Sequence, residues 1–329
     1  MSALVAGRGL VLTENIDDYP EGIILPVDKP YRWTSADVIR KLKYQAIRHF
    51  HKKNLKVGHA GTLDPLATGV LLVCIGKATK LAEELQASPK QYLAGVTFGA
   101  TTPSYDLEKE IDRLLPLDGV SEAALRSVLP DFVGEQDQVA PLFSAKSVDG
   151  VRAYEMARRA YKEAQRSGIP FDHTATDLLS RQSITIYSLD LENFGFVSKG
   201  GGMGPENCAT LGNIRGGDPS LAMGGAERSE AFSGPIPPPG DEAGKDRPLP
   251  GDEAGKSGRI HVADISAYDL PTAMLRVDCS KGTYIRALAR DLGEALGSGA
   301  FLSSLRRTRN GGIPVEDALS LSDALSLLR

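Results

Sequence analysis

One carboxylate, Asp64, lies in a stretch of chain whose backbone geometry is strongly constrained. Pro65 fixes its own φ angle, offers no N–H group and disfavours helical backbone at Asp64. Nearby glycines can adopt conformations that are closed to other residues: Gly58, Gly61 and Gly69. An apolar run over residues 70–75 follows and has the length of a buried strand. The sequence therefore predicts a shaped loop that carries Asp64 into a core strand, although Asp before Pro is also a common turn initiator without any chemical role.

The full string around this carboxylate is more specific than its spacing. Residues 58–80 read GHAGTLDPLATGVLLVCIGKATK, which resembles the signature of the TruB family, the tRNA pseudouridine synthases that act on the T loop. The resemblance implies that Asp64 is the catalytic nucleophile and that His59 contacts the flipped nucleotide. Taken alone, His59 is also consistent with a hydrogen-bonded loop histidine.

Other strings resemble the same family: residues 90–106 (KQYLAGVTFGATTPSYD), 279–286 (CSKGTYIR) and 302–307 (LSSLRR). The resemblance implies that Tyr92 lies against the target base and accepts a proton from it. It also implies that Arg286 pairs with Asp64, that Tyr284 packs near the flipped base, and that Leu305 belongs to the base pocket. Without the resemblance, Tyr92 would be a cross-strand packing aromatic and Arg286 a solvated side chain.

Two weaker matches lie on either side of these strings. Residues 28–43 (DKPYRWTSADVIRKLK) resemble the amino-terminal motif of the family, in which the Lys-Pro pair packs beside the catalytic loop. We therefore expect Lys29 to have a packing role, with RNA contact as the second possibility. Residues 138–146 (QVAPLFSAK) are compatible with a Q-x-P-x-x-S-A pattern but are not diagnostic of it. The 24 residues after Leu305 leave no room for the carboxy-terminal RNA-binding module of many family members.

Pseudouridine formation breaks the N1–C1′ bond of a uridine, turns the base and rejoins it through C5. A carboxylate suits this reaction because the sugar becomes electron-poor at C1′, as in glycoside cleavage. The reaction requires no metal and no cofactor, so we expect neither. Arg286 would orient Asp64 through a bidentate contact, and Tyr92 and Tyr284 would offer flat faces to a base taken out of its stack. The sequence leaves open whether Asp64 forms a covalent bond or removes a C2′ proton.

Two other functional classes are compatible with parts of this sequence. A catalytically silent RNA-binding or RNA-folding protein could use the same scaffold, but Asp64, Tyr92 and Arg286 are all present. An Asp64-dependent nucleosidase or glycosidase would need a second carboxylate as general acid. Neither of the two strongest strings places one near Asp64, which argues against this class.

The composition is that of an ordinary globular protein, with 329 residues, 41% hydrophobic and 24% charged. The sequence contains no apolar run of membrane-spanning length and no amino-terminal signal pattern. Its cysteines offer neither a disulfide framework nor zinc spacing: Cys74, Cys208 and Cys279. We therefore expect a cytoplasmic, monomeric protein that binds the T-arm stem-loop of tRNA and no membrane.

The net charge of −4 conceals two basic segments. Residues 36–60 contain seven Lys and Arg against the single acid Asp37, and residues 270–310 contain seven against three acids. Distribution matters more than the total for nucleic-acid binding. We therefore expect Arg40 and Lys43, together with the cluster at 306–309, to contact phosphates, although a charge run can also be only a solvated face.

The order of the predicted elements is irregular. Residues 1–21 carry no clear period and are expected to be a loose arm. Helices are predicted after Thr34 or Ser35, over 78–85, from Ser121 to Leu129 and over 285–296, and strands over 92–98, 184–189 and 273–279. This interleaving favours an α+β fold with a mixed, mainly antiparallel sheet and flanking helices. The resemblance implies the pseudouridine synthase fold, formed by one catalytic domain over 22–197 and 259–329.

Residues 198–258 have a different composition, with fifteen glycines, eight prolines and a repeated PGDEAGK string. Such a segment cannot bury enough apolar surface to offset the entropy lost on ordering. We interpret it as a low-complexity, disordered insertion.

Overall fold

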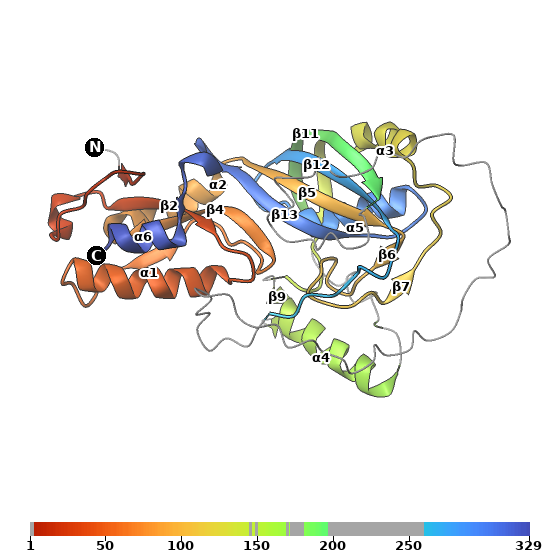
Figure 1. Ribbon diagram of the computed structural model, residues 1–329, viewed down its shortest axis with the longest axis horizontal. Coiled ribbons are helices and arrows are strands. Elements are labelled where there is room, and N and C mark those ends of the chain that lie inside the picture. The colour runs from red at the N-terminus through yellow and green to blue at the C-terminus, as the bar shows by residue number, and fades with distance from the viewer. Residues whose placement is uncertain (1–2, 145–146, 149–150, 169–170, 172–180, 197–259) are drawn as a thin grey trace.

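The computed structural model describes residues 3–144, 147–148, 151–168, 171, 181–196 and 260–329 (Figure 1). The predicted insertion over 198–258 lies outside the described residues. None of the helices in the described part of the chain is long and apolar enough to cross a membrane.

A mixed sheet forms the centre of the molecule, and eleven strands belong to it within the described ranges. Its main path, in spatial order, is β1 (Leu4–Val5), β2 (Ile23–Lys29), β4 (Ala67–Ile75), β13 (Ala300–Asn310), β5 (Lys90–Phe98), β12 (Pro271–Cys279), β11 (Arg181–Phe196) and β8 (Gly134–Val139). Three short strands attach to this path: β3 (Val57–His59), β14 (Ile313–Pro314) and β15 (Leu319–Ser320). Two-stranded pairs are formed by β6 (Ala100–Thr101) with β7 (Arg113–Leu114), and by β9 (Ser147–Val148) with β10 (Val151–Arg152). Most pairings are antiparallel, and β4 runs parallel to β13. The predicted α+β class is confirmed.

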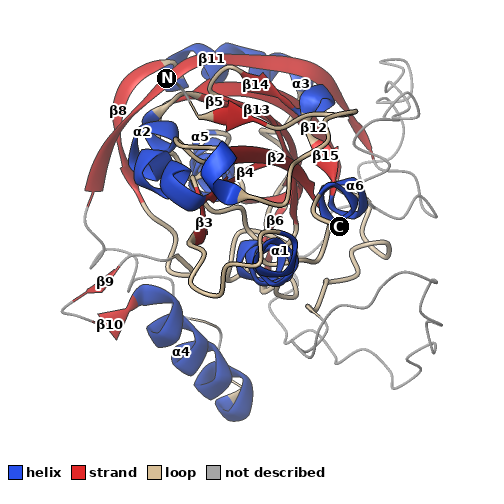
Figure 2. Cartoon of the chain, turned by 90° about the vertical axis from the view of Figure 1, so that its left-hand side faces the viewer, coloured by secondary structure: helices blue, strands red, loops and turns tan. Residues whose placement is uncertain are grey.

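Helices pack against both faces of the central sheet (Figures 1 and 2). They are α1 (Ser35–His49), α2 (Ala82–Ala87), α3 (Glu122–Val128), α4 (Ala153–Ser167), α5 (Ile285–Ala295) and α6 (Leu321–Leu327). Buried apolar residues of α1, α3, α5 and α6 share one core with the sheet, and α2 packs against a second core on the other side. By contrast, α4 lies below the sheet, apart from the other helices.

The strand after the Asp64 loop is buried on both faces. Leu71, Val73 and Ile75 of β4 belong to the main core, whereas Val70, Leu72 and Cys74 belong to the second core. A strand covered on both sides reads as a continuous apolar run rather than an alternating one. The predicted strand over 70–75 is therefore confirmed, and β4 anchors the end of the Asp64 loop in the most deeply buried part of the sheet.

Local signals explain the start of α1. The Thr34 side chain accepts a hydrogen bond from the Asp37 backbone, and the Asp37 side chain accepts one from the Thr34 backbone. This capping box satisfies two donors that the helix cannot satisfy internally. The predicted helix start at Thr34 or Ser35 is confirmed. The predicted helix over 78–85 is partly wrong, because residues 76–81 form a 3₁₀ helix and α2 begins only at Ala82.

The expectation of a loose amino-terminal arm is wrong for the described residues 3–21. Leu4 pairs with Ile23 in a parallel β1–β2 arrangement, and Ala6, Leu12 and Ile16 are buried in the main core. Periodicity cannot detect such a segment, because short irregular pieces bury single apolar residues without repeating at a helix or strand period.

Candidate active site

The Asp64 loop connects β3 to β4 and is tied down at several points. The Ser35 hydroxyl, on the first residue of α1, donates to the Leu63 carbonyl (3.0 Å) and accepts from the Leu63 N–H (2.9 Å). Gly69 has a φ of +101°, and a Cβ there would lie 2.1 Å from the Arg307 carbonyl oxygen. Only glycine fits this position. The start of α1 and the close approach of β13 therefore fix the loop that carries Asp64.

Lys29 holds the Asp64 loop from the protein interior. Its side chain is fully buried, and its ammonium donates to the carbonyls of Pro30 (2.9 Å), Trp33 (2.6 Å) and Pro65 (3.2 Å). Burial lowers the pKa of Lys29 to about 7, and the nearby Asp64 opposes this shift. An ammonium has three N–H donors, and all three have carbonyl partners here. Lys29 therefore occupies the expected packing position beside the loop, and its place in the interior contradicts the alternative of RNA contact.

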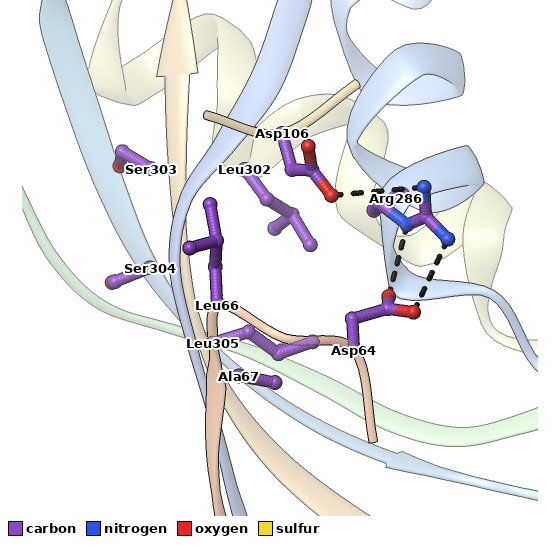
Figure 3. A pocket seen from close by; sticks show the side chains of 9 residues that line it. All are labelled: Asp64, Leu66, Ala67, Asp106, Arg286, Leu302, Ser303, Ser304 and Leu305. Atoms are coloured by element: carbon purple, nitrogen blue, oxygen red, sulfur yellow. Dashed lines mark hydrogen bonds and ion pairs between the residues drawn. The ribbon is translucent and has the colours of Figure 1, made fainter. Parts of the chain in front are cut away.

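Arg286 is the centre of the site (Figure 3). It lies in the first turn of α5 and is almost completely buried. Its Nε is 3.0 Å from Asp64 Oδ2 and its Nη2 is 3.3 Å from Asp64 Oδ1, so both carboxylate oxygens are engaged. The same guanidinium donates to the carbonyls of Ser104 (3.1 Å) and Phe143 (2.9 Å). Since Asp64 retains 39% side-chain exposure, its carboxylate is held from the interior and presented to solvent.

A second carboxylate, Asp106, lies on the other side of the guanidinium. Its Oδ2 is 3.6 Å from Arg286 Nη1, and its Oδ1 accepts from the Ser104 hydroxyl (2.6 Å) and the Glu108 N–H (2.9 Å). Burial raises the pKa of Asp106, and the charge of Arg286 opposes this rise. Burial, followed by the charge of Asp106, raises the pKa of Glu108 to about 7.

Asp106 is thus a second carboxylate beside Arg286, which the two strongest strings do not contain, and the argument against a glycosidase from its absence fails. Asp106 is the last residue of the 90–106 string, so the signal was present in the sequence. It was missed because residues 100–107 form a short strand and a turn, and their path back to Arg286 depends on tertiary structure.

A small hollow with about 20 Å³ of water-accessible space, open to solvent, lies beside this ion cluster (Figure 3). Its polar side holds Asp64, Asp106 and Arg286. The remaining lining residues come from the junction of the Asp64 loop with β4 and from β13: Leu66, Ala67, Leu302, Ser303, Ser304 and Leu305. Leu305, the predicted base-pocket residue, is one of them. A hollow of this size holds about one water molecule, so a planar ring enters beside Asp64 only if the lining side chains move.

The two predicted aromatic residues have different environments. Tyr92 on β5 is buried, opposite Arg307 on β13, and burial raises the pKa of its phenol. Tyr284 directly precedes α5 and is half-buried. The Gln138 amide accepts from the Tyr284 N–H (2.8 Å) and donates to the Tyr284 carbonyl (3.2 Å), which fixes the backbone next to Arg286. Tyr92 is not among the pocket-lining residues, and neither is Tyr284.

His59 lies on β3, half-buried, five residues before Asp64. Burial, with a contribution from the positive charge of Arg307, lowers the pKa of its imidazole. In the part of the chain described, its Nδ1 has no hydrogen-bond partner. The lowered pKa favours the neutral ring, and the Nδ1 without a partner is itself buried.

In the expected phosphate cluster at 306–309, Arg307 is buried, whereas Arg306 and Arg309 are partly exposed. Arg307 is 1% exposed and donates to the carbonyls of Val70 (2.7 Å), Gly61 (3.2 Å) and Thr62 (3.4 Å). Its neighbours also have acidic partners, since Arg306 pairs with Asp28 (2.8 Å) and Arg309 pairs with Asp278. The prediction that this cluster contacts phosphates is wrong for Arg307, because a side chain that binds the Asp64 loop from inside cannot reach RNA.

The other predicted RNA contacts lie on α1. Arg40 is exposed, with an intrahelical ion pair to Asp37 at 2.7 Å, and Lys43 is exposed as well. Among the described residues, no cluster of three or more His, Cys, Asp or Glu side chains is arranged to hold a metal ion.

These features define a class of site: a half-exposed carboxylate, oriented by a buried arginine, at the mouth of a small pocket in a mixed sheet. Two family profiles match the chain, TruB family pseudouridylate synthase (N terminal domain) over residues 48–191 and tRNA pseudouridylate synthase B C-terminal domain over residues 286–328. The chain belongs to the TruB family of pseudouridylate synthases.

Curated relatives agree with this assignment over most of their length. The tRNA pseudouridine synthase B of Phocaeicola vulgatus is 37% identical over 304 residues, which cover 92% of both chains. That of Flavobacterium johnsoniae is 34% identical over 307 residues, covering 93% of this chain and 96% of the relative. That of Thermus thermophilus is 36% identical over 297 residues, covering 90% and 75%.

A solved structure of a Cbf5–Nop10–Gar1 complex contains a similar fold, with a TM-score of 0.50 and 20% identity. The match covers 98% of this chain and 60% of that chain. The predicted pseudouridine synthase fold is confirmed.

Proposed function

We propose that this protein converts uridine 55 in the T loop of tRNA to pseudouridine, with Asp64 as the catalytic carboxylate. The relatives named tRNA pseudouridine synthase B support tRNA as the substrate class. The observation that carries the proposal is the bidentate contact of buried Arg286 with half-exposed Asp64 at the edge of a small hollow.

In the proposed reaction the target uridine leaves its stack and its base enters the pocket beside Leu305 and Leu302. The N1–C1′ bond breaks, the base turns, and a C5–C1′ bond forms, while the C5 proton is lost and N1 gains a proton. The product is therefore an isomer of the substrate. Asp64 either bonds to C1′ during this exchange or removes a C2′ proton, and both routes need the carboxylate on the sugar side of the pocket.

The aromatic residues and His59 are assigned the roles that the family resemblance implies. We propose that Tyr92 accepts the C5 proton and that Arg307, its neighbour on β13, stabilises the phenolate. Because burial raises the pKa of Tyr92, the phenol holds its proton at neutral pH, so it first gives that proton to N1 of the released base and then, as the phenolate, accepts the proton from C5. Tyr284 would stack near the flipped base, and His59 would contact the displaced nucleotide.

A nucleosidase is the second candidate, because the site does contain another carboxylate. Asp106 lines the pocket, but its Oδ1 already accepts two hydrogen bonds and its Oδ2 faces Arg286. It is therefore not placed to give a proton to the departing base. Release of free uracil is the outcome that would favour this alternative.

The test is conversion of an unmodified tRNA transcript, read by mass labelling of pseudouridine and by chromatography of free uracil. We expect one pseudouridine at position 55 and no uracil. A transcript with cytidine at position 55 is the matched control and should remain unmodified. Binding of tRNA without conversion would replace the proposal with a silent RNA-binding protein, and pseudouridine at another position would refute the assignment to uridine 55.

A further inference from the structure

Arg32 differs from the other cations around the Asp64 loop because most of its donors are free. Three buried cations contact this loop, and protein oxygens accept from every nitrogen of their charged groups: Lys29, Arg286 and Arg307. Arg32 is exposed, and its Nη2 donates to the Ile260 carbonyl at 2.8 Å. No carboxylate of the described residues lies within ion-pair distance of it. Since a guanidinium has five N–H donors, Arg32 keeps donors for a ligand.

The backbone of Arg32 lies beside the Asp64 loop. Arg32 belongs to the turn over residues 30–33, which connects β2 to α1. The Lys29 ammonium donates to two carbonyls of this turn, at 2.9 and 2.6 Å, and to the carbonyl of Pro65 at 3.2 Å. One buried cation thus binds both segments at once. The turn that carries Arg32 therefore lies against the residue that follows Asp64.

The guanidinium of Arg32 reaches a second segment that borders the active site, residues 260–265. The carbonyl that accepts from Arg32 belongs to the first residue of this segment. Further along it, the Ala263 N–H donates to the carbonyl of Leu107 at 2.8 Å, and Ala263 shares an apolar cluster with Leu66. Leu66 also lines the hollow at the site. Arg32 therefore bridges two segments that border this hollow, with its charged group on the solvent side.

Arg32 has a backbone conformation that is unfavourable for its residue type. Its φ is +61°, in the left-handed region where residues with a Cβ are uncommon. Glycine would form the same turn with less strain, so the backbone conformation does not require an arginine. Strained residues of this kind are concentrated at functional sites. The side chain of Arg32 is therefore the better explanation for an arginine at this position.

The acidic groups at the site give a phosphate-binding cation a clear purpose. Asp64 and Asp106 face a single guanidinium, that of Arg286, so the cluster has no excess of positive charge when both carboxylates are ionised. A nucleotide within a chain has a phosphate on each side of its sugar. A sugar beside Asp64 therefore brings two phosphates close to acidic groups. An exposed guanidinium at the edge of the site offsets this repulsion, and its planar fork matches two phosphate oxygens.

From this arrangement we propose that Arg32 binds one of the two backbone phosphates that flank the target nucleotide. The bond from Nη2 to residue 260 orients the guanidinium, and the remaining N–H groups donate to the phosphate. The inference rests on the proposed tRNA substrate, and it adds a contact that places the sugar beside Asp64. Because the phosphate takes no part in bond exchange, the contact should affect Kd and KM more than kcat.

The first test measures tRNA binding in an Asp64→Asn background, which prevents turnover. Arg32→Gly removes the side chain at a φ that glycine accepts, and Arg32→Lys keeps the charge without the fork. We expect Arg32→Gly to raise the Kd about tenfold and to lower the slope of log K against log salt by about 0.7, the value for one phosphate of a single strand. Its melting temperature should not fall. Arg32→Lys should restore part of the affinity. Arg126→Gln, at an exposed arginine of α3, is the control and should bind like the parent.

The second test locates the phosphate. Two tRNAs are assembled by ligation, each with one neutral methylphosphonate linkage, on the 5′ or the 3′ side of the target uridine. If Arg32 binds one of these phosphates, the corresponding linkage should weaken binding to the parent about tenfold. The same linkage should weaken binding to Arg32→Gly less than about twofold, because the contact is already lost. The other linkage should weaken both proteins by the same factor.

Three results would overturn the inference. A Kd of Arg32→Gly within twofold of the parent would do so, as would independent effects of the variant and of both linkages. A lower melting temperature of Arg32→Gly, with no rescue of binding by Arg32→Lys, would assign Arg32 to holding residues 260–265 in place. Conversion of unmodified tRNA by the wild-type protein separates this inference from the proposed function. If tRNA is converted but Arg32→Gly binds it normally, only the inference fails, whereas absence of conversion refutes the proposed function itself.

Discussion

Two segments with the same number of Lys and Arg residues place most of them differently in this molecule. Residues 36–60 place their bases on the outer side of α1 and on the turn that follows it. In residues 270–310, Arg286 and Arg307 lie in the interior, Arg276, Arg290, Arg306 and Arg309 have acidic partners, and Lys281 is exposed. The comparison shows that a count of charges does not distinguish residues that bind a partner from residues that build a site.

The reason for the difference is secondary structure. An amphipathic helix turns one side fully outward, so long cationic side chains on that side meet solvent. In contrast, β13 lies between β4 and β5, and a side chain there must be accommodated within the sheet. Arg307 is accommodated because the carbonyls of the Asp64 loop accept its donors. The interior charges therefore shape the site, and the exterior ones should govern affinity.

The largest expected effect is on turnover. It tests whether the charges that meet at Asp64 serve the reaction and not the binding of tRNA. Asp64→Asn keeps the shape of the side chain but removes the carboxylate that Arg286 orients. We expect turnover to fall at least about a hundredfold while the Kd for tRNA stays near that of the wild type. Single-turnover conversion and filter binding measure the two quantities. Turnover above about a hundredth of the wild-type value would remove Asp64 from the central role.

Arg307→Met tests whether the charged side chain of Arg307, on β13, stabilises the Asp64 loop. The substitution leaves three carbonyl groups without their buried donor, so we expect a loss of about 3 kcal/mol in the free energy of unfolding. Urea denaturation measures this loss. The comparison variant is Arg40→Met on α1, whose midpoint should remain close to that of the wild type because the side chain is 70% exposed. Equal stability of the two variants would contradict the distinction between arginines that stabilise the site and arginines that bind RNA.

Tyr92→Phe separates proton transfer from packing at the boundary between β5 and β13. Phe keeps the ring but loses the hydroxyl. If Tyr92 accepts the C5 proton, turnover should fall by about tenfold to a thousandfold, with little change in the melting temperature or the Kd for tRNA. Release of tritium from C5-labelled tRNA measures the step. A variant that retains full turnover would assign Tyr92 to packing alone.

The double variant Arg40→Gln with Lys43→Gln tests whether the exposed bases of α1 contact phosphates. Two lost phosphate contacts should lower the slope of log K against log salt by about 1.8. Arg306→Gln is the comparison variant from β13, because Arg306 is held by both Asp28 and the Thr68 hydroxyl and only 25% of its side chain is exposed, and it should leave the slope unchanged. Titrations of tRNA at several salt concentrations decide between the outcomes. If the α1 slope does not change, its bases form only a solvated face.

The sequence was sufficient for the parts of the fold that depend on local signals. The buried run at 70–75, the capping residues of α1 and the strands around Tyr92 follow from pattern and propensity. Around Asp64, the sequence predicts only the neighbours that lie within family motifs, Arg286 and Leu305. Asp106 was missed, and Arg307 was assigned to the surface, because both positions depend on how distant strands pair. The mistaken loose arm has the same cause, since Leu4 is ordered only by its partner Ile23.

The smallest expected effect concerns acid titration beside Arg286. Burial and the charge of Asp106 raise the pKa of Glu108 from an ordinary 4.5 to about 7. Between those two values the folded protein holds a proton that the unfolded chain has lost. The free energy of unfolding must therefore decrease as pH rises from 4.5 to 7, by the linkage between proton binding and stability. Glu108 is only partly buried, so solvent screening keeps the contribution small.

Glu108→Gln, which cannot titrate, should flatten this decrease, whereas Glu110→Gln, at an exposed position two residues away, should not. Urea midpoints measured at intervals from pH 4.5 to 7 give the slopes. Parallel slopes for Glu108→Gln and the wild type would show that Glu108 titrates like a surface acid, outside the cluster formed by Arg286, Asp64 and Asp106.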